Sequence, residues 1–190
     1  MPVPETARTA ARAAAAAFGG TPSVRRHYDR AESNGIDVLS CIDRPTENVT
    51  TYSTLGLHLA PNPMDDRDIR VELAGVADSA ATDFANVLAE AAFYVAKDHW
   101  LAAPGVTFPD LLGRYDLSDT LVHLLFVPPF PWPELGSVAL GDNITAQWLL
   151  GIPISETERR FLQDRGFDVF EAQMATMNVE YWRLDRPSIV

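Results

Sequence analysis

The sequence predicts an α+β fold: a single domain with a central, mostly antiparallel or mixed β-sheet flanked by helices. Three observations point to it: short strand-like segments with brief connections, one long helix with an apolar stripe, and a capped helix after the last apolar strand. With 190 residues, 47% of them hydrophobic, the chain can bury roughly 70% of its unfolded surface. We expect one domain over residues 1–190, with an alanine-rich helix at 1–17 and a tail at 178–190.

The first half of the chain alternates between apolar and polar side chains in three places. Residues 5–17 are strong helix formers ended by Gly19-Gly20. Segments 36–43, 51–59 and 69–76 then follow the period of a β-strand. Because the connections between them are too short for crossover helices, we expect an antiparallel meander.

The clearest helix is predicted for residues 79 to about 99, with Asp78 or Ser79 as its cap. Apolar residues recur on one face at helical spacing and should pack across the sheet. They are Phe84, Val87, Leu88, Ala91, Ala92 and Val95.

The second half adds two apolar strands, at 121–127 and 144–152, separated by a proline-rich stretch that suits neither helix nor strand. Ser155 and Glu158 have the spacing of a capping box, so a helix should run over 155–165 and end at Gly166. A further helix is expected at about 169–177, followed by a tail in strand or coil.

The charge is strongly negative and unevenly distributed. The net charge is -11, which makes phosphate neutralisation, and therefore nucleic-acid binding, an improbable role. Residues 1–30 nevertheless carry five arginines against two acids, whereas residues 71–158 carry twelve acids against two basic residues. The acidic region is either a solubilising surface or an electrostatic docking face for a basic protein.

Nothing in the sequence indicates a disulfide, a membrane span or a leader. Cys41 is the only cysteine, so an intramolecular disulfide and a cysteine-based zinc site are excluded. No run of eighteen apolar residues is present. We therefore expect a cytoplasmic protein with no membrane partner.

The residue patterns of catalysis are also missing. The four histidines lack the spacing of metal ligands, and no nucleotide-binding or nucleophile motif occurs. His58 and His123, each on a predicted strand, and Cys41 are interpreted as structural residues. Ser118, Asp119 and His123 are close in sequence, which leaves a small hydrolase as a minor alternative. We predict no cofactor, no metal and no enzymatic activity.

Features suited to protein binding are more evident. Phe130 and Trp132 lie among prolines, whose fixed backbone angles make a loop that loses little entropy on binding. The alternative is that both rings fold back over the core. Five acids are further candidates for contact with a basic partner, although solvated turns explain them as well: Asp65, Asp66, Asp68, Asp116 and Asp119.

The order of these segments resembles the suppressor-of-fused (SUFU) domain family, of the bacterial single-domain type. The resemblance covers residues 18–177 and depends on the order and spacing of its pieces. The sharpest are Thr54-Leu55-Gly56, Val71-Glu72-Leu73, Tyr94-Val95, Gly105, and Ile152-Pro153-Ile154 leading to Glu158. It implies a central sheet flanked by helices and a role as a binding module.

In animals, the family member restrains a zinc-finger transcription factor by gripping an extended peptide. Bacterial relatives are regarded as immunity proteins or antitoxins. The animal protein has a second domain, and an acidic residue follows its glycine matching Gly105, where this chain has Val106. We therefore expect an immunity-like protein that neutralises a protein partner, possibly a basic toxin. The alternative is a regulatory or scaffold module with a cellular, non-toxin partner.

Overall fold

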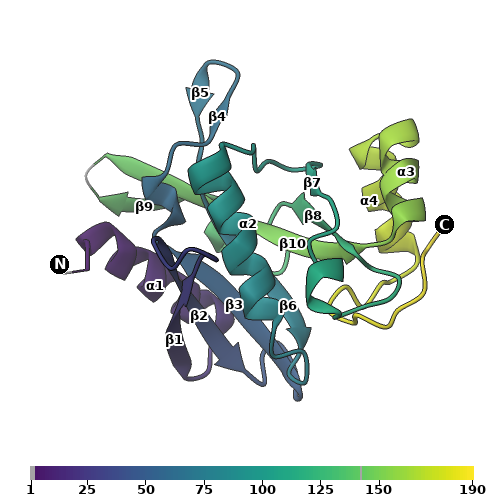
Figure 1. Ribbon diagram of the computed structural model, residues 1–190, viewed down its shortest axis with the longest axis horizontal. Helices are drawn as coiled ribbons and strands as arrows, with labels where there is room; N and C mark the ends of the chain where they lie inside the picture. Colours follow the sequence, from purple (N-terminus) through teal and green to yellow (C-terminus); the bar gives the residue numbers. More distant parts are fainter. Residues whose placement is uncertain (1–2, 142) are drawn as a thin grey trace.

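The computed structural model describes residues 3–141 and 143–190, and this part of the chain is built on one mixed sheet (Figure 1). The strands of the sheet are β1 (Pro22–Tyr28), β2 (Gly35–Ile42), β3 (Val49–Leu55), β6 (Arg70–Asp78), β7 (Thr107–Phe108), β8 (His123–Val127), β9 (Val138–Gly141) and β10 (Ile144–Ile154). Their order is β1-β2-β3-β6-β10-β8-β7, and β9 pairs with β10. Only the β6–β10 pair is parallel among these pairings.

Helices cover both faces of this sheet, which confirms the predicted α+β class. The helices are α1 (Glu5–Phe18), α2 (Phe84–Asp98), α3 (Glu156–Arg165) and α4 (Phe167–Thr176), with short 3-10 helices η1 (Leu57–Leu59), η2 (Gly113–Tyr115) and η3 (Pro133–Gly136). α2 packs on one face, and α1, α3 and α4 contribute to the core on the other. A small hairpin of β4 (Pro63–Met64) and β5 (Arg67–Asp68) projects at the top of Figure 1.

The predicted meander is confirmed, because β2, β3 and β6 pair antiparallel in chain order. The sequence did not indicate β1, whose residues are exposed apart from the half-buried His27, so burial leaves no alternating pattern. Nor did it indicate β9. Both strands lie beside better marked strands, which supply their pairing partners.

The second strand of the meander ends earlier than predicted. β3 stops at Leu55 because Gly56 takes a φ of 97°, a left-handed conformation that suits glycine, and η1 follows. His58 therefore lies on η1 and not on a strand. All seven residues of β3 are buried, since helices cover the sheet on both sides.

The long helix α2 begins at Phe84, five residues later than predicted, and neither Asp78 nor Ser79 caps it. Residues 79–83 form turns instead. The six stripe residues are all at most 1% exposed, which confirms the predicted packing face. The helix lies so close to β6 that a Cβ on Gly75 would be 2.6 Å from Phe84 Cε1 and 2.9 Å from Leu88 Cδ1.

The predictions for the end of the chain are close to the structure. Ser155 caps α3 in a full capping box with Glu158, and Gly166 ends the helix. α4 starts at Phe167, two residues earlier than expected. The tail has no regular strand and packs as coil against the core. Among the described residues, no helix is long and apolar enough to cross a bilayer.

Candidate protein interface

Part of the acidic charge in residues 71–158 is used inside the protein. Glu72 and Glu158 are buried, while Glu90 and Glu156 form ion pairs with arginines on their own or a neighbouring segment. These four carboxylates are neutralised or enclosed by the fold. The surface left for a docking partner is therefore less acidic than the residue count suggests.

Glu72 sits at the centre of a buried hydrogen-bond network that joins β3, η1 and β6. Its Oε1 accepts hydrogen bonds from Gly56 N at 2.7 Å and from His58 Nδ1 at 2.6 Å. Its Oε2 accepts from Thr54 Oγ1 at 2.6 Å and from Leu57 N at 3.3 Å. The positive φ of Gly56 lets successive backbone N–H groups converge on one carboxylate. The side chains of Thr54, His58 and Glu72 are fully buried, so this network is structural and offers none of these three side chains to a partner.

His123 and Glu156 join β8 to the start of α3. Because His123 Nδ1 accepts from Asp110 N, its Nε2 carries the proton and donates to Glu156 Oε2 at 2.9 Å. Hydrogen bonds from Arg159 first, and then from Arg160 and His123, lower the pKa of Glu156 to about 2. Both ring nitrogens of His123 are thus occupied by structural contacts.

The residues considered for a hydrolytic site do not come together. Ser118 donates its hydroxyl to Leu184 O, whereas His123 is bound to Asp110 and Glu156. Cys41 is fully buried, and burial raises the pKa of its thiol. In the described ranges, no three His, Cys, Asp or Glu side chains form a cluster suited to a metal ion.

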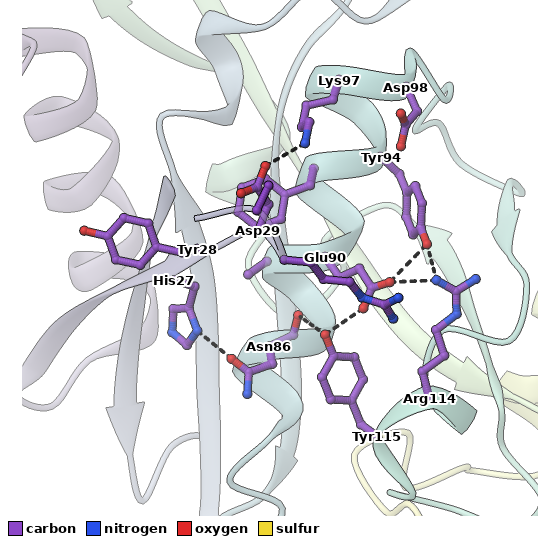
Figure 2. Close-up of a pocket in the computed structure, with 14 residues that line it drawn as sticks. His27, Tyr28, Asp29, Asn86, Glu90, Tyr94, Lys97, Asp98, Arg114 and Tyr115 are labelled. Carbon is purple, nitrogen blue, oxygen red and sulfur yellow. Dashed lines mark hydrogen bonds and ion pairs between the residues drawn. The ribbon is translucent and has the colours of Figure 1, made fainter. Parts of the chain in front are cut away.

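A polar groove lies between the end of β1, the exposed face of α2 and η2 (Figure 2). We call it the polar groove, and its main lining residues are His27, Tyr28, Asp29, Arg30, Asn86, Glu90, Tyr94, Lys97, Arg114 and Tyr115. At its centre, Glu90 accepts hydrogen bonds from the Tyr94 hydroxyl at 3.0 Å and the Tyr115 hydroxyl at 2.6 Å. Arg114 pairs with the same carboxylate at 2.7 Å.

The Glu90 contacts fasten η2 to α2 in a pH-dependent way. Burial alone would raise the pKa of Glu90, but hydrogen bonds from Tyr115, Tyr94 and Arg114 outweigh it and the pKa is lowered. A carboxylate with a lowered pKa stabilises the fold fully above its unfolded pKa of 4.5, and this contribution is lost as the pH falls through the folded value.

We therefore expect η2 to loosen from α2 below a pH of about 4.5. Hydrogen exchange of residues 113–116, measured between neutral and acidic pH, should show this loss of protection. The Glu90→Gln variant serves as control, since its amide does not titrate and its exchange at this segment should depend less on pH. Identical pH profiles for both proteins would contradict the assignment.

A larger depression of about 740 Å³ lies between the β8–β10 part of the sheet, α4 and the tail. We call it the apolar groove. Its apolar lining includes Leu125, Val127, Phe130, Ile152, Phe167, Phe170, Met174, Val179, Tyr181 and Trp182. Phe130 is 55% exposed, and its ring meets the edge of Tyr181 with centroids 5.2 Å apart. Burial raises the pKa of Tyr181 to about 12, so the ring stays neutral at physiological pH.

The rim of the apolar groove is acidic. Asp168, Glu171 and Glu180 line it, and none of the other described residues that line it is lysine, arginine or histidine. Glu180 has an exposed contact with Arg183 at 3.7 Å, a geometry of little energetic weight. The groove thus combines an apolar floor with negative charge at its margin.

The structure separates the two aromatic residues predicted as anchors. Trp132 is 6% exposed and packs against Phe18 of α1, with ring centroids 4.6 Å apart. It lies in the core, which favours the alternative that this ring covers the core, and its role as an interface anchor stays a prediction. Phe130, two residues earlier, is the ring that faces the apolar groove.

The five predicted acids all lie in exposed positions. Asp65 and Asp66 form the tip of the β4–β5 hairpin, whereas Asp68 is paired with Arg70 at 2.6 Å. Asp116 and Asp119 follow η2, whose Arg114 and Tyr115 line the polar groove. None of the five lines the apolar groove beside Phe130. Their part in partner binding stays a prediction.

Sequence reasoning missed the acidic rim and the aromatic pair Tyr181-Trp182. The sequence contains a signal for part of this surface, since two adjacent aromatic residues follow Glu180 in a tail with no regular period. What the sequence does not show is that α4 and the tail enclose a groove together. Sequence reasoning also did not place Tyr94 and Tyr115 in a polar groove with Glu90. Only the i, i+4 spacing of Glu90 and Tyr94 on one helix face can be seen in the local sequence.

Comparisons with known proteins agree with this architecture. The chain matches the family described as "Suppressor of fused protein (SUFU)" over residues 32–187. It is 33% identical, over the full length of both chains, to "Immunity protein YqcF" of Bacillus subtilis (strain 168). Its fold resembles a putative SUFU homolog of Neisseria gonorrhoeae, with a TM-score of 0.78, 16% identity, and 98% and 97% of the two chains covered.

A second solved structure, the Sufu–Fu complex, has a TM-score of 0.64 and 12% identity, with 96% of this chain and 90% of that chain covered. At such identities the two structures support the fold alone. The match over residues 32–187 and the full-length relative establish the family. The chain therefore belongs to the suppressor-of-fused family.

Proposed function

We propose that this protein is an immunity-like protein that binds a protein toxin and blocks its activity. The observation that carries the proposal is the 33% identity, over all of this sequence and all of its relative, with a Bacillus protein named as an immunity protein. Because the similarity spans both sequences from end to end, it is not limited to one segment of either protein. The mode of action that we infer is surface recognition.

The apolar groove is the surface that suits this role best. Its floor offers Phe130 and the tail aromatics to an apolar side chain of the partner, and a partly exposed aromatic ring is a frequent anchor of protein interfaces. The acidic rim of Asp168, Glu171 and Glu180 fits a basic partner. With a net charge of -11, the whole protein would also attract such a partner over a distance.

The experiment is to co-express this protein with the product of the neighbouring reading frame and to measure both complex formation and toxicity. Under the proposal, the two proteins co-purify and the toxicity disappears. A stable complex with a protein that has no toxic activity would favour the alternative, a regulatory or scaffold module. Absence of any complex with a verified toxin from that locus would refute the proposal.

Phe130→Ala tests the position of the interface. Removing an anchoring ring should weaken partner binding by about 2 kcal/mol, or roughly 30-fold. The melting temperature should change little, since the ring is more than half exposed. Calorimetric titration with the purified partner measures the affinity.

Trp132→Ala is the matched variant, from the same loop. Loss of this buried ring should cost about 3–5 kcal/mol of stability, while the fraction that remains folded binds the partner normally. If Trp132→Ala weakens binding and Phe130→Ala does not, the apolar groove is the wrong surface.

A further inference from the structure

Strand β1 leaves a long, open edge on the sheet. It is the first strand in the sheet order and pairs only with β2 among the described strands, through seven consecutive residues and without a bulge (Figure 1). The strand at the opposite end of the sheet, β7, has only two residues. Proteins usually protect such an edge by a bulge, a short strand, a covering element, or proline and charged side chains. β1 has the last kind of protection, with Pro22, Arg25 and Arg26. Here the backbone N–H and C=O groups on one side of β1 have no strand to pair with.

The side chains of β1 give the edge two different faces. The register places Val24 opposite Leu39 and Tyr28 opposite Gly35, so these two residues lie on the same face as Arg26. Val24 is 53% exposed and Tyr28 is 59% exposed, unusually high for apolar side chains on a strand. An added strand could cover both of them.

The edge is held in place before any partner arrives. His27 Nδ1 lies 2.7 Å from Asn86 Oδ1 of α2, and Lys97 of the same helix pairs with Asp29 at 2.6 Å (Figure 2). Asp29 also closes the β1–β2 connection, with hydrogen bonds from Asn34 and Ser33 that lower its pKa. Because β1 is already ordered, little entropy is lost when another strand pairs with it.

The charge at this edge is opposite to that of the whole protein. Arg25, Arg26 and Arg30 lie within nine residues that hold only one acid, Asp29. Arg26 pairs with Asp37 at 3.1 Å, but Arg25 and Arg30 form no ion pair with any other described residue. Acidic side chains on an incoming strand would find these guanidinium groups available.

A second copy of this chain fits the edge poorly. Antiparallel pairing of two β1 strands along their whole length would place Arg25 opposite Arg25 of the other copy, because it is the middle residue. Like charges directly opposite each other destabilise a strand pair. The arginines thus act against self-association and favour a partner of opposite charge.

We propose that β1 accepts an extended segment of a partner protein as an additional strand, and that this segment alternates apolar and acidic side chains. Backbone hydrogen bonds along the edge supply affinity, and the side chains of Val24, Arg25 and Tyr28 supply selectivity. This surface is separate from the apolar groove and does not depend on the immunity role.

The probe is a capped synthetic peptide in which glutamate and valine alternate along the length of β1. Titrated into the full chain, it should slow amide hydrogen exchange and shift amide resonances within residues 22–30. A second peptide with lysine in place of glutamate should have no such effect. Equal effects of both peptides, or none from the acidic one, would overturn the proposal. So would protection of residues 22–30 by raised protein concentration alone, since the occupant would then be a second copy.

Arg25→Glu provides the matched test on the protein side. This substitution should lower the affinity for the acidic peptide about tenfold, because the attraction between Arg25 and a glutamate of the peptide becomes a repulsion between two carboxylates. Arg67→Glu makes the same charge change on the exposed β4–β5 hairpin and should leave the affinity nearly unchanged. An equal loss in both variants would mean that net charge, and not pairing at β1, controls binding, and would contradict the proposal.

Discussion

Replacing Glu72 by alanine is expected to lower the free energy of unfolding by about 3–5 kcal/mol, the usual cost of breaking a buried charged network. The carboxylate is fully buried and accepts hydrogen bonds from Thr54, Gly56, Leu57 and His58. Without it, these donors remain buried and unpaired. Since the free energy of unfolding of such a domain is only about 5–15 kcal/mol, the variant should be barely stable.

Glu72→Gln should lie between the wild type and Glu72→Ala in chemical denaturation. Its amide oxygen can still accept from Gly56 and His58, and its NH2 group can donate to Thr54 Oγ1, but Leu57 N loses its acceptor. Glu134→Ala removes an exposed carboxylate and should leave stability nearly unchanged. If the glutamine and alanine variants unfold at the same denaturant concentration, the network is not organised as described.

Arg186→Met should have an effect of similar size, about 3–5 kcal/mol, because it leaves a buried carboxylate without its partner. Arg186 is 7% exposed and binds Glu158 at 2.6 and 3.2 Å and Pro153 O at 2.7 Å. The guanidinium thus fastens the tail to α3 and to the end of β10. Hydrogen exchange should show residues 178–190 losing protection before the sheet does.

A double variant, Arg186→Met with Glu158→Gln, should recover part of this loss. The buried charge is then gone, and the glutamine oxygen can still accept from Ser155 N, as Glu158 does at 2.7 Å. Arg183→Ala breaks exposed ion pairs in the same tail and should cost no more than about 1 kcal/mol. A loss in Arg183→Ala as large as in Arg186→Met would show that any change in the tail, and not the buried pair, is responsible.

Several of the sequence pieces that carry the family resemblance belong to these two networks. Thr54-Leu55-Gly56 and Val71-Glu72-Leu73 meet at the Glu72 carboxylate. Ile152-Pro153-Ile154 and Glu158 meet at Arg186. Buried polar groups demand particular partners at particular positions, so they leave a recognisable pattern. These networks explain the family resemblance, whereas the fold class is predicted from the strand alternation and the apolar stripe of the long helix.

The candidate interfaces could not be predicted in the same way. Phe130 and Trp132 share one proline-rich loop, yet only Trp132 is covered, because Phe18 from the other end of the chain packs on it. Phe84, the first residue of α2, similarly packs closely over the distant Gly75 of β6. Such long-range contacts have no trace in the local pattern. Strand β1 lacks even a burial period, since all its residues except His27 are exposed.

The position of β10 has a consequence for the order of assembly during synthesis. β10 is the strand that joins the β1-β2-β3-β6 half of the sheet to β8 and β7. The β1-β2-β3-β6 half can form early, because its strands are neighbours in the sequence. β8 and β7 can join this half only after residues 144–154 have left the ribosome. Parallel pairing of β10 with β6 also joins residues 76 positions apart, such as Arg70 and Ala146, and such distant contacts form slowly. A nascent chain stalled before β10 would therefore have an incomplete sheet, in which the edge of β6 that pairs with β10 is unpaired.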